Sequence, residues 1–420
     1  MNLLDRIKSR LQLLAVLVLF GCAASDEGLE IALDSNTRVD FTELNLNATN
    51  LIIDSLRTDN ENRLPAGAYT DDLLGSIEAS AHIQYRFLSG SEIVDTLNFD
   101  SLVFFARVEQ FINPGENFDE LLVYNITEEI FGEVVYLADF ELALSPEPVD
   151  TLLLITTEEG KVVKNFLDSF GQYLFDTLSQ EDVTVSGFTA GIALAPSATS
   201  TGISTINLAD STFFTLYSSD SGGNIYETRF ALTQNYFSNV QRDRSSSALS
   251  GAQDLDTLDI SDEFALINPL FGVSTLIDLA PLASFTQSNP DIIINRAEIH
   301  TGINTTSSEP LEAIRYYFFQ EKSGIRGDGL IQDPFNTAIL TNEAYLSTRR
   351  GLLLGVPDSS NTVYNSDITL FIEEFVRSTV EDNDPIAEKL VLTGNSFMNL
   401  EETRVDLSNL RLRIYFTFIE

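Results

Sequence analysis

The side chains that most often carry acid–base, nucleophilic or metal chemistry are scarce in this sequence. It contains two histidines, His82 and His300, and one cysteine, Cys22. Two histidines are too few for a histidine-rich zinc site, and no G-x-S-x-G turn accompanies them as in a serine hydrolase. Both lie where apolar and polar residues alternate, which favours the exposed face of a sheet over a role as base or ligand. We therefore assign no catalytic residue.

Carboxylates, by contrast, are abundant. The chain has 63 acidic and 24 basic residues and a formal net charge of −39. This balance repels nucleic acid and anionic membrane surfaces, so no nucleic-acid partner is expected. Among so many acids, some pair always has the separation that a glycosidase needs. A carboxylate-dependent glycan hydrolase is therefore an alternative that the acid content neither supports nor excludes. No cofactor is predicted.

Two acidic stretches contain candidate calcium ligands, because carboxylate oxygens are the ligands that calcium prefers. Neither stretch has the D-x-[DN]-x-[DN]-G spacing of an EF-hand loop, and a solvated loop is the favoured interpretation of both. The candidate ligands are Asp254, Asp256, Asp259, Asp382 and Asp384.

The first 21 residues have the layout of a secretion signal. Arg6, Lys8 and Arg10 precede an apolar run at 13–20, which is the order of charge and hydropathy in a signal peptide. The run is too short to span a bilayer, which takes about 20 apolar residues. It ends in Leu19-Phe20-Gly21-Cys22, which resembles the lipobox cleaved by lipoprotein signal peptidase. We predict lipidation of this cysteine; the alternative is an ordinary signal peptide followed by an incidental cysteine.

The residues after the cysteine bear on location. Ala23 rather than aspartate follows it, which favours the outer over the inner membrane by the best-known sorting rule. Residues 22–45 mix small and acidic residues without a sustained period, which predicts a tether between lipid and fold. Within it, Ser25-Asp26-Glu27 resembles the acidic signals that carry some Bacteroidota lipoproteins to the cell surface. A solvated linker explains the same residues equally well.

Most of the remaining chain has the period-two pattern of antiparallel strands. Two stretches, 162–170 and 368–375, instead have the spacing of short helices that cover sheet ends. Short strands separated by turn residues predict a mainly β fold: two tandem antiparallel β-sandwich, jelly-roll-like halves with a few short covering helices. The strand candidates are 81–87, 102–108, 121–126, 149–155, 188–195, 212–217, 225–232, 292–299, 314–319 and 410–418.

A polar, serine-rich and then acidic stretch marks the expected boundary between the halves. The predicted organisation is a lipoprotein signal peptide over 1–21, a tether over 22–45, a first β-rich domain over 46–244, a linker over 245–263 and a second β-rich domain over 264–420.

A triplet of aspartate, a hydroxyl residue and leucine recurs along the chain. It resembles the acceptor pattern of Bacteroidota protein O-glycosylation, although a turn that leads into a strand has the same composition. Thr257 is the preferred acceptor because it lies in the predicted linker, where a sugar would not disturb packing. The triplets are Asp54-Ser55-Leu56, Asp95-Thr96-Leu97, Asp100-Ser101-Leu102, Asp150-Thr151-Leu152, Asp176-Thr177-Leu178 and Asp256-Thr257-Leu258.

Several short pieces of the chain, taken in order, carry a family resemblance. They are Asp54-Ser55-Leu56-Arg57-Thr58, Leu64, Gly67-Ala68-Tyr69, Asp71-Asp72, Leu74-Gly75, Ala79, Gly187-Phe188-Thr189-Ala190-Gly191-Ile192, Gly272-Val273-Ser274-Thr275-Leu276-Ile277-Asp278-Leu279 and Ile294-Asn295-Arg296-Ala297-Glu298. Together they resemble a large uncharacterised family of Bacteroidota outer-membrane lipoproteins, defined as a domain of unknown function, over nearly all of the mature chain. The resemblance implies an outer-membrane lipoprotein of unassigned activity and supplies no catalytic residues.

Two functions from different classes therefore remain. The favoured one is a non-enzymatic envelope component, anchored through lipid, that binds a protein or a glycan. The alternative is a carboxylate-dependent glycan hydrolase. A pocket with two close carboxylates flanked by aromatic residues would favour the hydrolase, whereas scattered acids would favour the binding protein.

The first test concerns the anchor. Replacing the lipidated residue, Cys22→Ala, removes the acceptor thiol, and the apolar run is too short to hold the chain in a bilayer. We expect the variant to be unprocessed or released from membranes, as measured by fractionation and intact mass. Processing and membrane retention equal to those of the unaltered chain would contradict the lipoprotein assignment.

Overall fold

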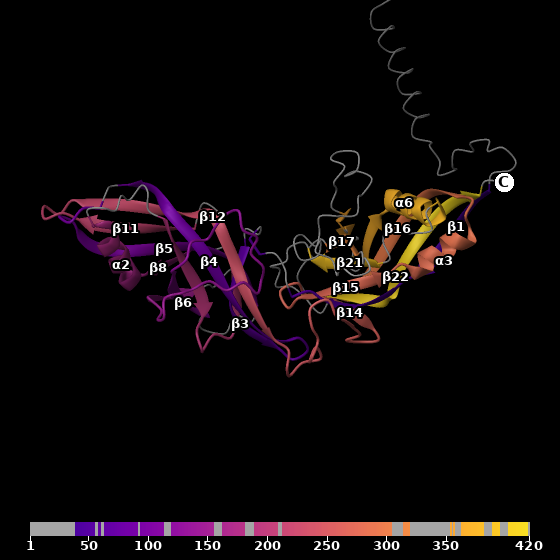
Figure 1. Ribbon diagram of the computed structural model, residues 1–420, viewed down its shortest axis with the longest axis horizontal. Helices are drawn as coiled ribbons and strands as arrows, with labels where there is room; N and C mark the ends of the chain where they lie inside the picture. The colour runs from indigo at the N-terminus through magenta and orange to yellow at the C-terminus, as the bar shows by residue number, and fades with distance from the viewer. Residues whose placement is uncertain are drawn as a thin grey trace, which may run out of the picture.

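The protein is mainly β, as predicted. The computed structural model describes residues 38–54, 58–59, 63–90, 93–112, 119–154, 162–180, 189–208, 212–304, 314–319, 353–354, 356–357, 363–381, 389–394 and 402–418. Every strand pairing over these residues is antiparallel, and the strands form three sheets. The sheets belong to two bodies that lie end to end along the long axis (Figure 1).

The first body contains a ten-stranded sheet ordered β12-β11-β5-β10-β3-β4-β9-β6-β7, with β8 beside β5. Because β12 also pairs with β4, six of these strands form a closed circuit of hydrogen-bonded neighbours. The elements are β3 (Arg63–Asp71), β4 (Gly75–Gly90), β5 (Asn98–Ile112), β6 (Asp119–Ile126), β7 (Asp150–Leu154), β8 (Val162–Phe166), α2 (Asp168–Leu178), β9 (Thr189–Pro196), β10 (Ile203–Asn207), β11 (Phe213–Ser219) and β12 (Ile225–Asp243).

Aromatic residues fill the core of this body. The fully buried ring of Tyr85 lies 5.3 Å from the ring of Phe214 and 6.0 Å from that of Phe170. Phe170 comes from α2, whose first turn is held by Asp150: its carboxylate accepts the N–H groups of Ser169 and Phe170 at 3.1 and 3.2 Å. Capping the free N–H groups from a neighbouring strand fixes the apolar face of the helix against the sheet.

The second body has two six-stranded sheets that share one hydrophobic core with α3 and α6. One sheet is ordered β1-β22-β16-β20-β19, with β14 beside β22; the other is ordered β13-β2-β15-β21-β17-β18. The elements are β1 (Arg38–Asn45), β2 (Asn47–Ile52), β13 (Thr257–Leu258), β14 (Phe264–Ile267), β15 (Val273–Asp278), α3 (Ala280–Ser288), β16 (Ile292–Asn304), β17 (Ile314–Phe319), β18 (Leu353–Leu354), β19 (Val356–Pro357), β20 (Val363–Asp367), α6 (Thr369–Glu381), β21 (Lys389–Gly394) and β22 (Thr403–Phe418).

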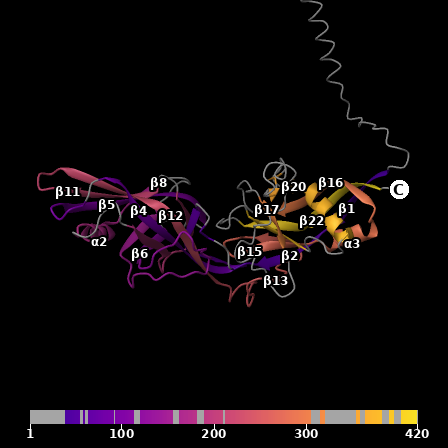
Figure 2. The same ribbon diagram turned by 45° about the horizontal axis from the view of Figure 1, so that its top comes forward.

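The first body is inserted into the second. Strand β1, expected within the tether, pairs with β22 along its whole length, and β2 pairs with β15 and β13 (Figure 2). The chain therefore leaves the second body after β2, builds the first body and returns through 244–256. Residues 245–263, expected as an accessible linker, bury Leu249 and Leu255 and contribute β13. Strand β1 differs from the expectation because its alternating pattern finds a partner at the far end of the chain.

Each predicted strand corresponds to an observed strand, but one predicted helix is partly wrong. Residues 162–166 form β8, which pairs with β5, and helix α2 begins only at Asp168. Val162, Val163 and Phe166 have helical spacing, but so short a stretch can also form a strand, and here it pairs with β5. The predicted helix over 368–375 is confirmed as α6.

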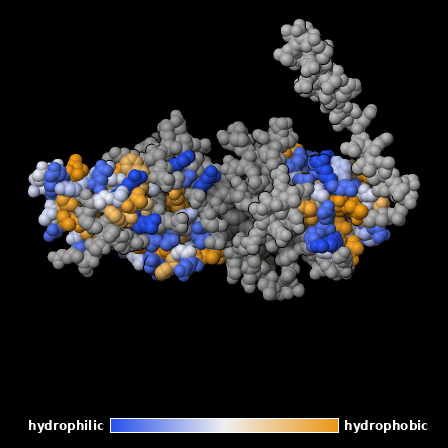
Figure 3. Space-filling view, turned by 90° about the horizontal axis from the view of Figure 1, so that it is seen from above, coloured by the Kyte–Doolittle hydropathy of each residue, from blue (hydrophilic) through white to orange (hydrophobic). Residues whose placement is uncertain are grey.

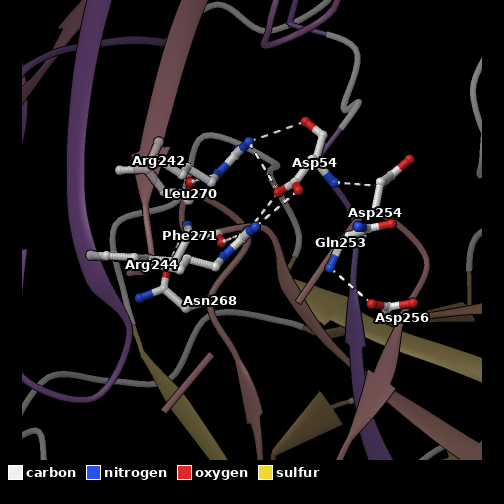
Figure 4. A network of polar contacts seen from close by, with 9 residues as sticks. All are labelled: Asp54, Arg242, Arg244, Gln253, Asp254, Asp256, Asn268, Leu270 and Phe271. Carbon is white, nitrogen blue, oxygen red and sulfur yellow. Dashed lines mark hydrogen bonds and ion pairs between the residues drawn. The ribbon is translucent and has the colours of Figure 1, made fainter. Parts of the chain in front are cut away.

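A network of ion pairs and hydrogen bonds ties the two chain crossings together (Figure 4). The carboxylate of Asp54, just after β2, accepts Arg244 Nη1 at 2.9 Å and Nη2 at 2.5 Å. Arg242 Nη1 donates to the carbonyl oxygen of Asp54 at 3.1 Å, while the N–H of Asp54 donates to Asp254 at 2.7 Å. The side chains of Arg242 and Arg244 are only 5% and 10% exposed. Two buried cations therefore depend on one carboxylate.

The network lies beside a hydrophobic cluster to which both bodies contribute. It includes Leu51 and Ile52 from β2, Ile77 and Val240 from the first body, and Phe271. Gly272 follows with φ +72°, and a Cβ atom there would lie 2.7 Å from the carbonyl oxygen of Ile53. Only glycine combines this backbone conformation with such a close approach.

This network predicts that Asp54→Ala destabilises the protein by about 3 kcal/mol, because two buried arginines lose their carboxylate. Glu43→Ala is the matched control: Glu43 also contacts two arginines, Arg411 and Arg413, but these are 34% and 35% exposed. We expect the control to cost much less, because exposed ion pairs contribute little to stability. Urea unfolding measures both, and equal losses would contradict the role of Asp54.

Candidate functional site

A pocket of about 410 Å³ opens beside the β3–β4 hairpin, close to the junction. Its size falls within the range of about 300–1,000 Å³ that is typical of small-ligand sites. Most of its side chains carry hydroxyl groups, and we call it the hydroxyl pocket. Its lining is Ala68, Tyr69, Thr70, Ser76, Ile77, Glu78, Ser197, Ala198, Ser200 and Thr201.

Two chain segments form the walls. One is the β3–β4 hairpin, in which Thr70 pairs with Ser76 and Ala68 with Glu78. The other is the turn between β9 and β10, which the N–H of Ala68 contacts by donating to the carbonyl oxygen of Gly202 at 3.0 Å. A Cβ atom on Gly67 would lie 2.1 Å from that oxygen, so glycine is required where the walls meet. The pocket is therefore built by hydrogen-bonded backbone.

Tyr69 and Glu78 give the pocket its aromatic and charged groups. The ring of Tyr69 contacts Phe271 edge-on, with centroids 6.2 Å apart, so the second body supports this wall. Burial, followed by the nearby carboxylate of Asp71, raises the pKa of the Tyr69 phenol. Its hydroxyl therefore stays protonated and can both donate and accept. Glu78 is exposed and can accept hydrogen bonds from a ligand.

Two of the calcium candidates, Asp254 and Asp256, hold backbone N–H groups in the fold. Asp254 accepts the N–H of Asp54, and Asp256 accepts the N–H of Gln253 at 2.9 Å. Asp259 is exposed. Among the described residues, no group of three or more histidine, cysteine, aspartate or glutamate side chains could hold a metal ion. Asp382 and Asp384 lie outside the described residues.

Some of the predicted modification sites lie within the described residues and others lie outside them. Cys22 lies outside the described residues. Thr257 is exposed in β13, opposite Leu51 of β2. In the other triplets that the structure describes, Thr96 is exposed, whereas Ser101, Thr151 and Thr177 are only partly so. O-glycosylation at Thr257 stays a prediction.

His82 is buried, which corrects the expectation of an exposed sheet histidine. It is 3% exposed, and its ring stacks on Phe237 with centroids 4.5 Å apart. Phe237 stacks in turn on Tyr136 at the same spacing. Tyr136 belongs to residues 127–149, which we call the β6–β7 loop and which covers this face of the sheet. Both faces of β4 are therefore buried here. The alternation of apolar and polar residues along this strand does not place the polar side chains in solvent.

His300 is partly exposed on the sheet of the second body. Its Nε2 atom lies 3.8 Å from Glu298 Oε2. Desolvation, followed by the charge of Arg413, lowers the pKa of His300. Glu43 pairs with Arg413 on the adjacent strand at 2.5 Å. This cross-strand ladder of charges stabilises the sheet.

The sequence analysis missed the hydroxyl pocket. Gly67 and Gly75 were noted as part of the family resemblance, and the structure places both at positive φ. The signal that could have found the pocket is the run Ser197-Ala198-Thr199-Ser200-Thr201, where four of five residues carry hydroxyl groups. Its proximity to the β3–β4 hairpin depends on strand pairing that no local pattern predicts.

No family model matches the chain, and no curated protein matches it either. The resemblance to Bacteroidota outer-membrane lipoproteins therefore stays a prediction.

The buried His82 predicts a component of acid sensitivity. Desolvation lowers its pKa from 6.5 to about 4. Below pH 6.5 the unfolded chain binds a proton that the folded chain excludes until about pH 4, so stability falls as the pH drops through this window. The total loss is about 3 kcal/mol, because one pKa unit corresponds to about 1.4 kcal/mol. His82→Phe preserves the stack and should remove this loss.

Urea unfolding of both proteins at a series of pH values between 7 and 4 measures the difference. Each series is referred to its own stability at pH 7, so that a general effect of the substitution cancels. Parallel curves for His82→Phe and the unaltered protein would show that His82 does not titrate in this window.

Proposed function

We propose that the protein is a lipid-anchored outer-membrane protein that binds a glycan in the hydroxyl pocket without hydrolysing it. The observation that carries the proposal is the lining of the pocket: hydroxyl groups, one carboxylate and one aromatic ring around about 410 Å³. Glycans present many hydroxyl groups and an apolar ring face. Hydroxyl and carboxylate side chains exchange hydrogen bonds with the former, while an aromatic ring packs against the latter.

The same lining argues against the hydrolase. Hydrolysis of a glycosidic bond takes two carboxyl groups on opposite sides of the bond. Among the residues that line the pocket, Glu78 is the single carboxylate. Asp71, on the same hairpin, accepts the N–H groups of Leu73 and Leu74, each at 2.8 Å, and so holds the turn. A binding protein needs no second acid, whereas a hydrolase of this kind does.

The anchor rests on the sequence. A cleaved secretion signal with lipid on Cys22 and Ala23 behind it supports the outer membrane, with exposure on the cell surface as the extension of that proposal. The strong acidic surplus keeps the folded part soluble and away from anionic lipid.

Over the residues that the structure describes, no helix is long and apolar enough to cross a membrane.

The glycan proposal is tested on a glycan array with the full mature protein, followed by calorimetry with the strongest ligand. Glu78→Gln should weaken binding by about tenfold or more, because a charge-assisted hydrogen bond is worth about 1.5–3 kcal/mol. Tyr69→Ala should weaken it by a similar factor through loss of the ring and its hydroxyl. Tyr173→Ala is the matched control, since Tyr173 is 51% exposed on α2, away from the pocket.

Two outcomes would count against the proposal. Glycan binding that survives both pocket substitutions would remove the pocket from the function. Release of new reducing ends that Glu78→Gln abolishes would establish the hydrolase instead.

A further inference from the structure

The β6–β7 loop exposes an unusual share of large apolar side chains. Phe131 is 55% exposed, Val135 42%, Val134 39% and Phe140 38%. On the face of the first body seen in Figure 3, by comparison, apolar residues occur in small patches among hydrophilic ones. Exposed apolar residues that cluster in one loop mark an interaction surface, because each costs free energy while it faces water.

The loop is held in place by side chains beneath it. The N–H of Phe131 donates to the hydroxyl oxygen of Tyr136 at 2.9 Å, and Asn235 Nδ2 donates to the carbonyl oxygen of Ile130 at 3.0 Å. Gly132 allows this contact, since a Cβ atom there would lie 2.7 Å from Asn235 Oδ1. Phe140 packs edge-on against Tyr136 with centroids 4.9 Å apart. The loop is therefore preorganised, and binding of a partner costs little conformational entropy of the loop.

Charge identifies the kind of partner. The exposed acids Glu128, Glu129, Glu133, Asp139 and Glu141 lie between and beside the apolar side chains, whereas no lysine or arginine occurs between Arg107 and Lys161. An apolar centre with an acidic rim complements an apolar patch with a basic rim.

We propose that the β6–β7 loop is a docking surface for a protein that presents an apolar patch ringed by lysine or arginine. Phe131, Val134 and Val135 supply the apolar anchors, and the five acids supply steering and register. An anionic membrane does not fit, because surfaces that insert into one carry basic rather than acidic residues beside the apolar side chains. A second copy does not fit either, because it would bring the same acidic rim against itself.

The experiment uses a fluorescent Leu/Lys amphipathic peptide as the basic probe and its Leu/Glu counterpart as the acidic one, with the full mature protein. The double variant Phe131→Ser, Val135→Ser should weaken binding of the Leu/Lys peptide by about tenfold or more, as loss of interface anchors does. Replacing Glu128, Glu129 and Glu133 with glutamine should weaken it as well and flatten its salt dependence. All five side chains are exposed, so these variants fold.

The matched control is Phe41→Ser, Ile225→Ser. These residues are 47% and 70% exposed on β1 and β12, outside the loop. It should change the affinity by less than about twofold, which separates docking at the loop from general attraction to an acidic protein. Equal weakening by control and loop variants would overturn the proposal, as would tighter binding of the Leu/Glu peptide. Loop-dependent dimerisation, or loop-dependent binding to phosphatidylglycerol vesicles, would assign the surface to another occupant and overturn it too.

Discussion

The contact of Asp54 with Arg242 in β12 and Arg244 just after it is the interaction on which the arrangement of the two bodies depends. The chain crosses between them twice, and both crossings pass through this network. Buried arginines are expensive to desolvate, so the folded state that contains them must also contain their carboxylate. Separating the bodies would leave Arg242 and Arg244 without that partner and expose the shared hydrophobic cluster. The first body is joined to the second by only two chain crossings, and this network fixes its orientation relative to the second body.

The hydroxyl pocket depends on the same network. Its aromatic wall, Tyr69, contacts Phe271, whose carbonyl oxygen accepts Arg244 Nη2 at 2.8 Å. Gly272 then turns the chain at positive φ, toward the carbonyl oxygen of Ile53. Pieces of sequence far apart in the chain thus meet at one place: the β3–β4 hairpin, the end of β2 and the start of β15. Residues 54, 67–69, 74–75 and 272–273, on which part of the predicted family resemblance rests, all lie here.

The sequence predicted the elements better than their partners. Alternation at 81–87 and 410–418 identified β4 and β22 because the side-chain period of a strand is local. Strand β1 was missed as part of a tether, since its partner lies more than 350 residues away in β22. Residues 162–166 were taken as helix because the spacing of Val162, Val163 and Phe166 fits one helix face, and five residues are too few to decide between helix and strand. His82 was expected on the surface because alternation cannot show that the β6–β7 loop closes the second face. The hydroxyl pocket depends on the same kind of long-range pairing.

The β6–β7 loop is attached to the same junction as the hydroxyl pocket. The carbonyl oxygen of Tyr136 accepts the N–H of Thr58 at 2.9 Å, and that of Ala138 accepts the N–H of Val240 at 2.6 Å. Thr58 follows Asp54 in the first crossing, and Val240 precedes Arg242 on β12. Because the supports are hydrogen-bonded backbone rather than hinges, a partner on the loop and a glycan in the pocket would face a single rigid frame. Two weak contacts on one anchored protein would then reinforce each other, because each raises the effective concentration at which the other forms.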